Sequence, residues 1–282
     1  MMITNNSFLI FFISLVMSWI ILKLKISSFE KILLDKPNLR SSHKKPIPRG
    51  GGISFFLVST IYFVFAGKWK IIFLLPLALV GFVDDLINIS PKLRFAIQFI
   101  TVMMLFSIEN LFNLKIFEIE IFNNIILLAL LIASVGVINF INFMDGVDGL
   151  VAGCMIVIFS VISITLDPIF WSVVGSVFGF FIWNWPPAKL FMGDIGSTYL
   201  GALFVFTLTK SNSNNDLLGY LLMSTPLIAD ASICILLRYL NGQNIFEAHN
   251  LHLYQRLFMN GWKHNHISLV YIFSCFVISL SY

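Results

Sequence analysis

The chain has 282 residues, of which 58% are hydrophobic and only 11% are charged, and its mean hydropathy is +0.91. About a quarter of the residues in an ordinary soluble domain are charged, so the composition excludes that class of protein. The formal net charge is only +4, and no nucleic-acid partner is predicted.

Ten apolar runs follow one another along the chain. They fall at 7–24, 53–67, 71–83, 95–108, 121–141, 149–166, 169–185, 197–209, 217–237 and 267–281. A helix needs about 20 residues to cross the hydrocarbon core of a bilayer, so the shorter runs are expected to borrow flanking residues or to tilt. The runs are solidly apolar rather than alternating, which argues against a β-barrel. We predict an all-α, polytopic transmembrane helix bundle of about ten helices, with residues 1–282 forming a single domain.

The first run has no basic start and no small-residue cleavage site, which predicts a membrane anchor rather than a removed signal peptide. Three cysteines, Cys154, Cys234 and Cys275, lie in apolar runs and lack the paired spacing of a disulfide or a zinc site. They are expected to be packing residues.

The basic residues are unevenly divided between the loops predicted on one side of the membrane and those predicted on the other side. If the N-terminus lies outside, 14 of the 18 Lys and Arg residues fall on the inner side, which leaves Lys68, Lys70, Lys115 and Lys210 on the outer side. Cytoplasmic loops are enriched in Lys and Arg. The N-terminus is therefore predicted to be outside and, with ten helices, the C-terminus also.

Five of the nine aspartates stand at predicted helix ends, and under this topology all five face the inner side. They are Asp84, Asp85, Asp145, Asp148 and Asp194. A carboxylate at mid-bilayer costs about 2.5–3.5 kcal/mol on insertion scales, so these five are expected to face water, a cation or one another. A single aspartate at a helix end commonly just meets water, but three acidic segments on one face favour a divalent cation. Mg²⁺ takes one or two carboxylates together with the phosphate oxygens of a substrate.

The middle acidic segment has a regular spacing. Asn139, Asn142, Asp145 and Asp148 recur every three residues and form one polar stripe if the helix continues through them. Two glycines between and after the aspartates instead favour a helix end, where backbone can approach a ligand closely.

Two other segments are candidates for phosphate binding. Gly196 and Ser197 lie in a Gly-Asp-Ile-Gly-Ser segment that opens a predicted helix, whose free N–H groups suit a phosphate. Ser197 can equally be a simple helix cap. The basic loop after the first run is expected either to contact anionic lipid head groups or to bind a phosphate through Arg40, His43 and Arg49.

The loop before the last run carries His249 and His252, spaced for one face of a helix, followed by Tyr254, Gln255 and Arg256. A histidine pair in an interfacial loop is often only solvated, but this pair shares the inner side with the carboxylates, which favours a functional role. Asp230 lies inside the ninth run, where an ionisable group indicates either a functional site or a structural pairing with Arg238 through a third group.

Four motifs stand in a fixed order along the chain. They are Asp35-x-Pro37-Asn38-x-Arg40-x-x-His43, Asp84-Asp85 with Ser90-Pro91-Lys92, Asn139-x-x-Asn142-x-x-Asp145-Gly146-x-Asp148-Gly149-Leu150, and Phe191-x-Gly193-Asp194-x-Gly196-Ser197. As a set they resemble the polyprenyl-phosphate N-acetylhexosamine-1-phosphate transferases, over about residues 35–260. That family includes the enzymes that initiate O-antigen and enterobacterial common antigen, the phospho-muramoyl-pentapeptide transferase of peptidoglycan synthesis, and the eukaryotic dolichol counterpart.

The resemblance implies a multi-pass protein of the bacterial inner (plasma) membrane with its active site on the cytoplasmic side. It implies that undecaprenyl phosphate attacks a UDP-N-acetylsugar, such as UDP-GlcNAc or a UDP-N-acetyl-6-deoxyhexose, to give a lipid diphosphate sugar and UMP. The implied cofactor is Mg²⁺, with Mn²⁺ as a substitute. Whether the protein is a monomer or a homodimer stays open.

The resemblance also implies roles for individual residues. Asp194 is expected to be a magnesium ligand, and Asp84 and Asp85 are expected to hold the metal or to activate the lipid phosphate. The remaining expected roles are positioning of nucleotide and diphosphate by Asn142, Asp145 and Asp148, and contact with phosphate charge by Lys92 and His249.

The last loop favours one branch of the family. It reads His-Asn-Leu-His from His249, whereas the peptidoglycan branch has three consecutive histidines. This favours the branch that serves O-antigen and lipopolysaccharide, although Asn250 stands where that branch commonly has a basic residue. This loop is expected to set the choice of sugar. The peptidoglycan transferase remains the alternative within the family.

Two alternatives come from other classes of membrane protein. A cation-coupled transporter also uses intramembrane carboxylates, but near the middle of the bilayer and often between repeats, whereas these acids crowd one interface. A transferase of the CDP-alcohol class would need Ala-Arg after Asp148, where Gly149-Leu150 stand.

Overall fold

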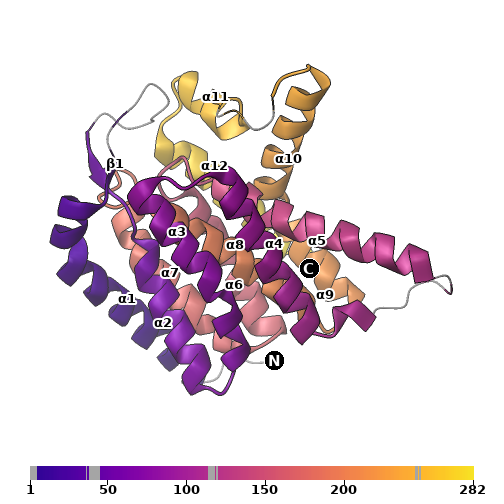
Figure 1. The fold of residues 1–282 in the computed structure, drawn as a ribbon. Coiled ribbons are helices and arrows are strands. Elements are labelled where there is room, and N and C mark those ends of the chain that lie inside the picture. The colour runs from indigo at the N-terminus through magenta and orange to yellow at the C-terminus, as the bar shows by residue number, and fades with distance from the viewer. Residues whose placement is uncertain are drawn as a thin grey trace.

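The computed structural model describes residues 5–35, 37, 45–113, 118, 120–244, 247 and 249–282. These residues form twelve α-helices, three short 3₁₀ helices and one pair of two-residue strands (Figure 1). The α-helices are α1 (Asn5–Ile32), α2 (Gly52–Phe65), α3 (Leu75–Ile87), α4 (Pro91–Ile108), α5 (Glu120–Phe143), α6 (Leu150–Thr165), α7 (Trp171–Asn184), α8 (Gly193–Thr209), α9 (Asn214–Met223), α10 (Thr225–Leu240), α11 (Leu253–Met259) and α12 (His264–Ser279). The remaining elements are η1 (Trp69–Leu74), η2 (Leu111–Asn113), η3 (Pro168–Phe170) and the antiparallel strands β1 (Leu34–Asp35) and β2 (Ile47–Pro48).

The prediction of an all-α protein is confirmed, and each of the ten apolar runs coincides with helix. The ninth run is two helices, α9 and α10, which meet at an angle of 69°. Pro226 stands in the first turn of α10, and a proline inside a continuous helix would remove a backbone hydrogen bond and clash with the preceding turn. The run is therefore broken just before Pro226. One further helix, α11, matches no apolar run and lies in the loop that precedes the last run.

Three helices, α1, α4 and α5, are long and apolar enough to cross a membrane by themselves, and α9 with α10 makes a fourth if the bent pair is counted as one span. The outer surface of α1 is apolar, with Phe8 and Phe12 more than half exposed. Large apolar side chains cover the outside of α5 and α12 in the same way. Such a surface is stable in lipid rather than in water, and the chain is a helical membrane protein. The number of crossings and the orientation stay predictions.

The centre of the bundle is α8. Every residue from Ile195 to Thr207 is buried, because α2, α3 and α5 pack around this helix. Glycines allow the backbones to come very close: a Cβ atom on Gly81 of α3 would lie only 2.6 Å from backbone atoms of Ile195. Small residues at helix contacts permit this approach in membrane proteins. The close packing brings the last turn of α3 against the first turn of α8.

The short helix α11 is attached to α10 by a buried carboxylate. Asp230 of α10 accepts hydrogen bonds from the backbone N–H groups of Leu253 (2.7 Å) and Tyr254 (3.2 Å), and from the Tyr271 hydroxyl (2.6 Å). Acidic side chains commonly satisfy the free N–H groups that begin a helix. Arg238 is occupied elsewhere, where it donates to the Gln243 side chain.

Candidate active site

Three helix ends that are far apart in sequence surround one cavity of about 440 Å³. They are the end of α3, the turn between α5 and α6, and the start of α8. Four of the five predicted aspartates line this cavity: Asp85, Asp145, Asp148 and Asp194. Arg49, which follows strand β2, lines it as well. Residues of the acidic motifs therefore share one site, with an arginine from the basic loop.

The fifth aspartate, Asp84, joins the site through an arginine. Arg94 donates from one nitrogen, Nη1, to Asp84 Oδ2 at 2.7 Å and to Asp194 Oδ2 at 2.9 Å. The other oxygen of Asp84 accepts from the backbone N–H of Ile89 at 2.7 Å. Both oxygens of Asp84 are thus occupied. The shared arginine offsets part of the repulsion between two carboxylates that would otherwise oppose each other.

Asp85 is bound to the N-terminus of α8. Its carboxylate accepts the backbone N–H of Asp194 at 3.0 Å and that of Ile195 at 3.2 Å. A carboxylate is favoured there because the first N–H groups of a helix have no internal partner and carry positive charge. Gly193 leaves space for this carboxylate, because a Cβ atom at that position would lie 2.4 Å from it. Its φ of +75° also favours glycine. Arg49 also lies near this carboxylate, at 3.7 Å between Nε and Oδ1.

The predicted polar stripe of α5 divides into two parts. Asn142 donates to Asp194 Oδ1 at 3.0 Å and to Ser197 Oγ at 2.8 Å, so it lies in the acidic site. Asn139 lies one turn earlier and exchanges amide hydrogen bonds with Gln98 of α4, at 2.7 and 3.3 Å. The helix ends at Phe143, and the two aspartates of the stripe therefore belong to the turn rather than to a helical face.

Asp145 is the first of the two carboxylates of this turn that line the cavity. Its burial and the negative charges of Asp194, Asp85 and Asp148 raise the pKa of its side chain well above the ordinary aspartate value. No basic residue is among the groups that set this pKa in the described part of the chain. A proton or a bound cation would relieve this excess of negative charge.

Asp148, in contrast, is held by the surrounding backbone and by a histidine. One oxygen accepts the backbone N–H of Ala188 at 3.0 Å, and the other lies 3.1 Å from Nδ1 of His264 in α12. Ser268 of α12 donates to the backbone carbonyl of Asp148 at 2.7 Å. These contacts fasten the turn to α12 and to the segment before α8.

Part of the last loop lines the cavity, including the predicted Tyr254 and Gln255, but its two histidines do not. Asn250, Tyr254 and Gln255 line it, and Tyr254 also donates to the Phe143 carbonyl that ends α5, at 2.9 Å. His249 and His252 are not among its lining residues and lie instead against α10. Arg256 lines a second cavity of about 520 Å³ between α10, α11 and α12.

The other predicted residues lie at various distances from the carboxylates. Gly196 is buried where α2 and α8 touch, and Ser197 accepts from Asn142 in the site. Lys92 is exposed near the start of α4, and Arg94 makes the contacts with the carboxylates. The predicted residues Arg40 and His43 lie outside the described residues.

Arg94 and His264 were not singled out from the sequence. Arg94 looked like one more basic residue of the inner side, and its separation from Asp194 along the chain hides the contact. The one available signal for Arg94 was its position in the first turn of α4, the next helix after the Asp-Asp pair. His264 had no such signal, because it is the first residue of α12 and directly follows a run of exposed residues, 259–263.

The sequence was compared with models of known protein families. The sequence profile of "Glycosyl transferase family 4" matches residues 68–212. This range covers Asp84, Asp85, Arg94, Asp145 and Asp194, which meet at the site. The match agrees with the family resemblance that the four motifs predict.

Three relatives illustrate the range of the match. A Bacillus subtilis protein named "Probable undecaprenyl-phosphate N-acetylglucosaminyl 1-phosphate transferase" is 29% identical over 88% of this chain and 76% of its own length. The "Undecaprenyl-phosphate alpha-N-acetylglucosaminyl 1-phosphate transferase" of Thermotoga maritima is 34% identical over 60% of this chain and 54% of its own length. The "Phospho-N-acetylmuramoyl-pentapeptide-transferase" of Fervidobacterium nodosum is 29% identical over 92% of this chain and 88% of its own length.

Proposed function

Since the chain belongs to glycosyl transferase family 4, we propose that it is a phosphosugar transferase that moves an N-acetylhexosamine 1-phosphate from a UDP-sugar to undecaprenyl phosphate. The released nucleotide would be UMP. The names of the relatives from Bacillus subtilis and Thermotoga maritima support this acceptor and this group. The proposal of a transferase is preferred to that of a transporter, because the match to a glycosyl transferase family includes the acidic segments themselves.

The observation that carries the proposal is the joint cavity of four carboxylates and Arg49. Both substrates of the proposed reaction are anionic at phosphate, and they repel each other and the carboxylates. A site for them must therefore supply positive charge where the phosphates meet. Arg49 supplies one such charge: its side chain is 27% exposed, and its contacts with Asp85 leave part of the guanidinium toward the cavity.

A divalent cation is proposed as the second source of positive charge. The residues fit Mg²⁺, because this ion prefers carboxylate and phosphate oxygens and Asp145 faces an excess of negative charge. Asp194 and Asp145 would hold it; Asp84 is the other candidate, although both of its oxygens already accept hydrogen bonds. When bound, Mg²⁺ would polarise the phosphoryl oxygens and stabilise the UMP leaving group. Mn²⁺ would serve in the same way.

In the proposed reaction an oxygen of the lipid phosphate attacks the sugar-side phosphorus of the UDP-sugar. One P–O bond forms, the P–O bond to the bridging oxygen breaks, and that oxygen leaves as part of UMP. Direct attack is proposed rather than a phosphosugar-aspartate intermediate on Asp84 or Asp85. Asp85 is held by two backbone N–H groups, and Asp84 is held by Arg94 and Ile89.

The last loop is proposed to select the sugar. Asn250, Tyr254 and Gln255 face the same cavity as the carboxylates, and a site recognises a hydroxyl chiefly through polar groups that lose their partner when it is missing. A donor of the UDP-N-acetyl-6-deoxyhexose type is proposed alongside UDP-GlcNAc. Exchange of residues 249–256 for those of a GlcNAc-specific relative should change the preference between the two donors. Unchanged preference with turnover intact would locate specificity elsewhere.

The nucleotide product tests the reaction. Purified protein with undecaprenyl phosphate, Mg²⁺ and a panel of UDP-N-acetylsugars is expected to release UMP, because attack at the sugar-side phosphorus leaves one phosphate on uridine. Release of UDP would mean ordinary glycosyl transfer and would exclude the proposal. The panel should include UDP-N-acetylmuramoyl-pentapeptide, since the Fervidobacterium nodosum relative matches most of this chain. Turnover of that donor alone would indicate peptidoglycan synthesis instead of O-antigen or other surface polysaccharide synthesis.

The proposed location is the bacterial inner membrane, with the carboxylate cavity on the cytoplasmic side, where UDP-sugars are found. The excess of basic residues predicted on that side supports this orientation. Oligomerisation, including a homodimer, is not needed for the proposed chemistry.

A further inference from the structure

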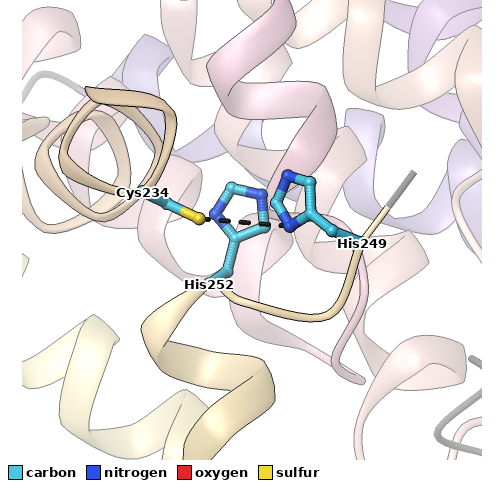
Figure 2. A group of neighbouring side chains, drawn as sticks. All are labelled: Cys234, His249 and His252. Atoms are coloured by element: carbon cyan, nitrogen blue, oxygen red, sulfur yellow. Dashed lines mark hydrogen bonds between the residues drawn. The ribbon is translucent and has the colours of Figure 1, made fainter. Parts of the chain in front are cut away.

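A second group of potential metal ligands lies between α10 and the last loop (Figure 2). Cys234 points out of α10, and His249 and His252 extend toward it from the loop before α11. Each residue offers one ligand atom, and these atoms lie within 4.8 Å of one another. The pair Cys234 Sγ and His249 Nδ1 is 4.0 Å apart. None of the three residues lines the carboxylate cavity.

We propose that Cys234, His249 and His252 bind a thiophilic divalent cation of the zinc class. One thiolate with two imidazoles suits Zn²⁺, whereas Mg²⁺ prefers oxygen ligands. Zn–S bonds of about 2.3 Å and Zn–N bonds of about 2.0 Å place tetrahedral ligand atoms roughly 3.3–3.6 Å apart. The three ligand atoms therefore need only a small inward movement to close on an ion. Three protein ligands leave the fourth position to water or another small ligand.

The surroundings of His252 support a metal at this place. Its side chain is only 4% exposed, and its Nδ1 is buried with no hydrogen-bond partner among the described residues. That atom lies 3.7 Å from Asp230 Oδ1, just beyond hydrogen-bond distance. A metal-bound histidine commonly donates its second ring N–H to a carboxylate. With Nε2 bound to a metal, the single proton of the neutral ring would sit on Nδ1 and could be donated to Asp230.

His249 is chemically suited to be a ligand. A neutral imidazole is the form that binds metals, and the half-buried ring of His249 already lies beside the Cys234 sulfur. At present Nδ1 accepts the backbone N–H of Leu251 at 3.2 Å. This N–H is exposed, and water can replace the bond when the nitrogen turns to a metal.

A cation here would tie the last loop to α10. Asn250 lies between the two histidines and faces the carboxylate cavity, and Tyr254 follows them in the first turn of α11. The cation would thus fix the position of the cavity wall without taking part in the chemistry at the aspartates. This inference does not depend on the identity of the sugar or on the proposed reaction.

Titration with Co²⁺ tests the site in the purified, metal-stripped full-length protein. We expect a thiolate-to-cobalt charge-transfer absorption that saturates at one Co²⁺ per chain and that is lost when Zn²⁺ is added. Excess Mg²⁺ should not remove it. The Cys234→Ser variant should lose the absorption, whereas the matched variant Cys275→Ser should keep it, because Cys275 is buried in α12 beside Cys154 and is not one of the three clustered ligands.

Replacing the nearby carboxylate provides a second measurement. Asp230→Asn should weaken Co²⁺ binding about 10- to 100-fold, as is usual when the carboxylate behind a metal-bound histidine is lost. If Cys234→Ser does not fold, His249→Gln at the half-buried loop position gives the same test. The proposal is overturned if no thiolate band develops at saturating Co²⁺, or if the band persists in folded Cys234→Ser.

Discussion

Asp194 occupies the point where several elements of the site meet. Its side chain accepts from Arg94 and Asn142, and its backbone N–H donates to Asp85. Asp194→Asn keeps the shape of the side chain and removes its charge. We expect turnover to fall on the order of a hundredfold or more, while the variant inserts and purifies like the wild type. Measured UMP release within about tenfold of wild type, or about 1.4 kcal/mol of barrier, would be too small an effect for a direct metal ligand.

Asp145 predicts a link between pH and cation binding. Because its pKa is raised well above the ordinary aspartate value, its carboxyl is protonated over a pH range in which a free aspartate is ionised. A proton and a cation compete for it, so the Mg²⁺ concentration for half-maximal activity should rise as the pH falls. Asp145→Asn should weaken this dependence. A half-maximal Mg²⁺ concentration that stays constant with pH in the wild type would separate Asp145 from the cation.

The same pKa shift predicts how stability depends on pH in EDTA. The folded state retains the proton at pH values where the unfolded chain, with an aspartate pKa of about 3.9, has already lost it. Stability should therefore decrease as the pH rises from about 4 toward the raised pKa, and Mg²⁺ should reverse the loss. Melting temperatures in detergent, with Asp145→Asn as the control, measure this effect independently of turnover.

Arg94 and Lys92 are neighbours with different surroundings, which allows a matched comparison. Removing Arg94 leaves Asp84 and Asp194 without their shared partner, and a hydrogen bond to a charged group contributes about 1.5–3 kcal/mol. Arg94→Gln should lower both the melting temperature and kcat. Lys92→Ala, at an exposed position, should leave the melting temperature unchanged and should raise KM if Lys92 meets substrate phosphate. Equal melting temperatures for the two variants would contradict the bridging role of Arg94.

For individual residues, the sequence predicted the aspartates of the site better than the residues that they contact. Aspartates are conspicuous in an apolar chain because burying them in lipid is costly, so each one draws attention. Arg94 is hidden among many basic residues of the inner side. The pairing of Asn139 with Gln98, and of Asp148 with His264, depends on which helices are neighbours, and spacing along one helix does not contain that information.

At the level of helices, the contact between α3 and α8 decides whether the two acidic segments meet. A Cβ atom on Gly81 would lie 2.6 Å from the backbone of α8, so Gly81→Ala should push the helices apart and break the bonds from Asp85 to the start of α8. Both the melting temperature and turnover should fall. The control is Gly136→Ala in α5, where the nearest atom would be 3.7 Å away, and where alanine is about 0.8–1 kcal/mol better than glycine in a helix. Equal melting temperatures for the two variants would mean that the contact is not tight.

The helices themselves were largely predictable, and their ends were less so. An apolar run specifies a buried or lipid-facing helix directly, which explains why every run coincides with one. The polar stripe that begins at Asn139 does not continue on a helix as far as Asp145 and Asp148. The helix α5 ends at Phe143, and Gly149 adopts a φ of +75° before α6. The helix α11 has only seven residues, and its start depends on Asp230 from a distant helix. Such a helix leaves no apolar run in the sequence.

The molecule as a whole has two chemically different ends. At the end opposite the carboxylate cavity, Lys70 and Lys210 both pair with Glu109, at 3.1 and 2.5 Å, and Lys68 lies 3.1 Å from Asp167. Three of the four lysines that the sequence assigns to the outer side are thus neutralised by acids. The arginines of the cavity end meet the aspartates of the proposed active site instead. The two sets of charges agree with an arrangement in which these two ends lie on opposite sides of a membrane.

The direction can be measured with single cysteines at the two ends. The three native cysteines are buried, so the wild-type protein should react little with a membrane-impermeant maleimide. Lys68 and Lys92 are both exposed and belong to opposite predicted sides. In intact cells Lys68→Cys should be labelled and Lys92→Cys should not, and permeabilised cells should label both. The reverse pattern would place the carboxylate cavity outside, away from cytoplasmic UDP-sugars, and would contradict both the predicted orientation and the proposed function.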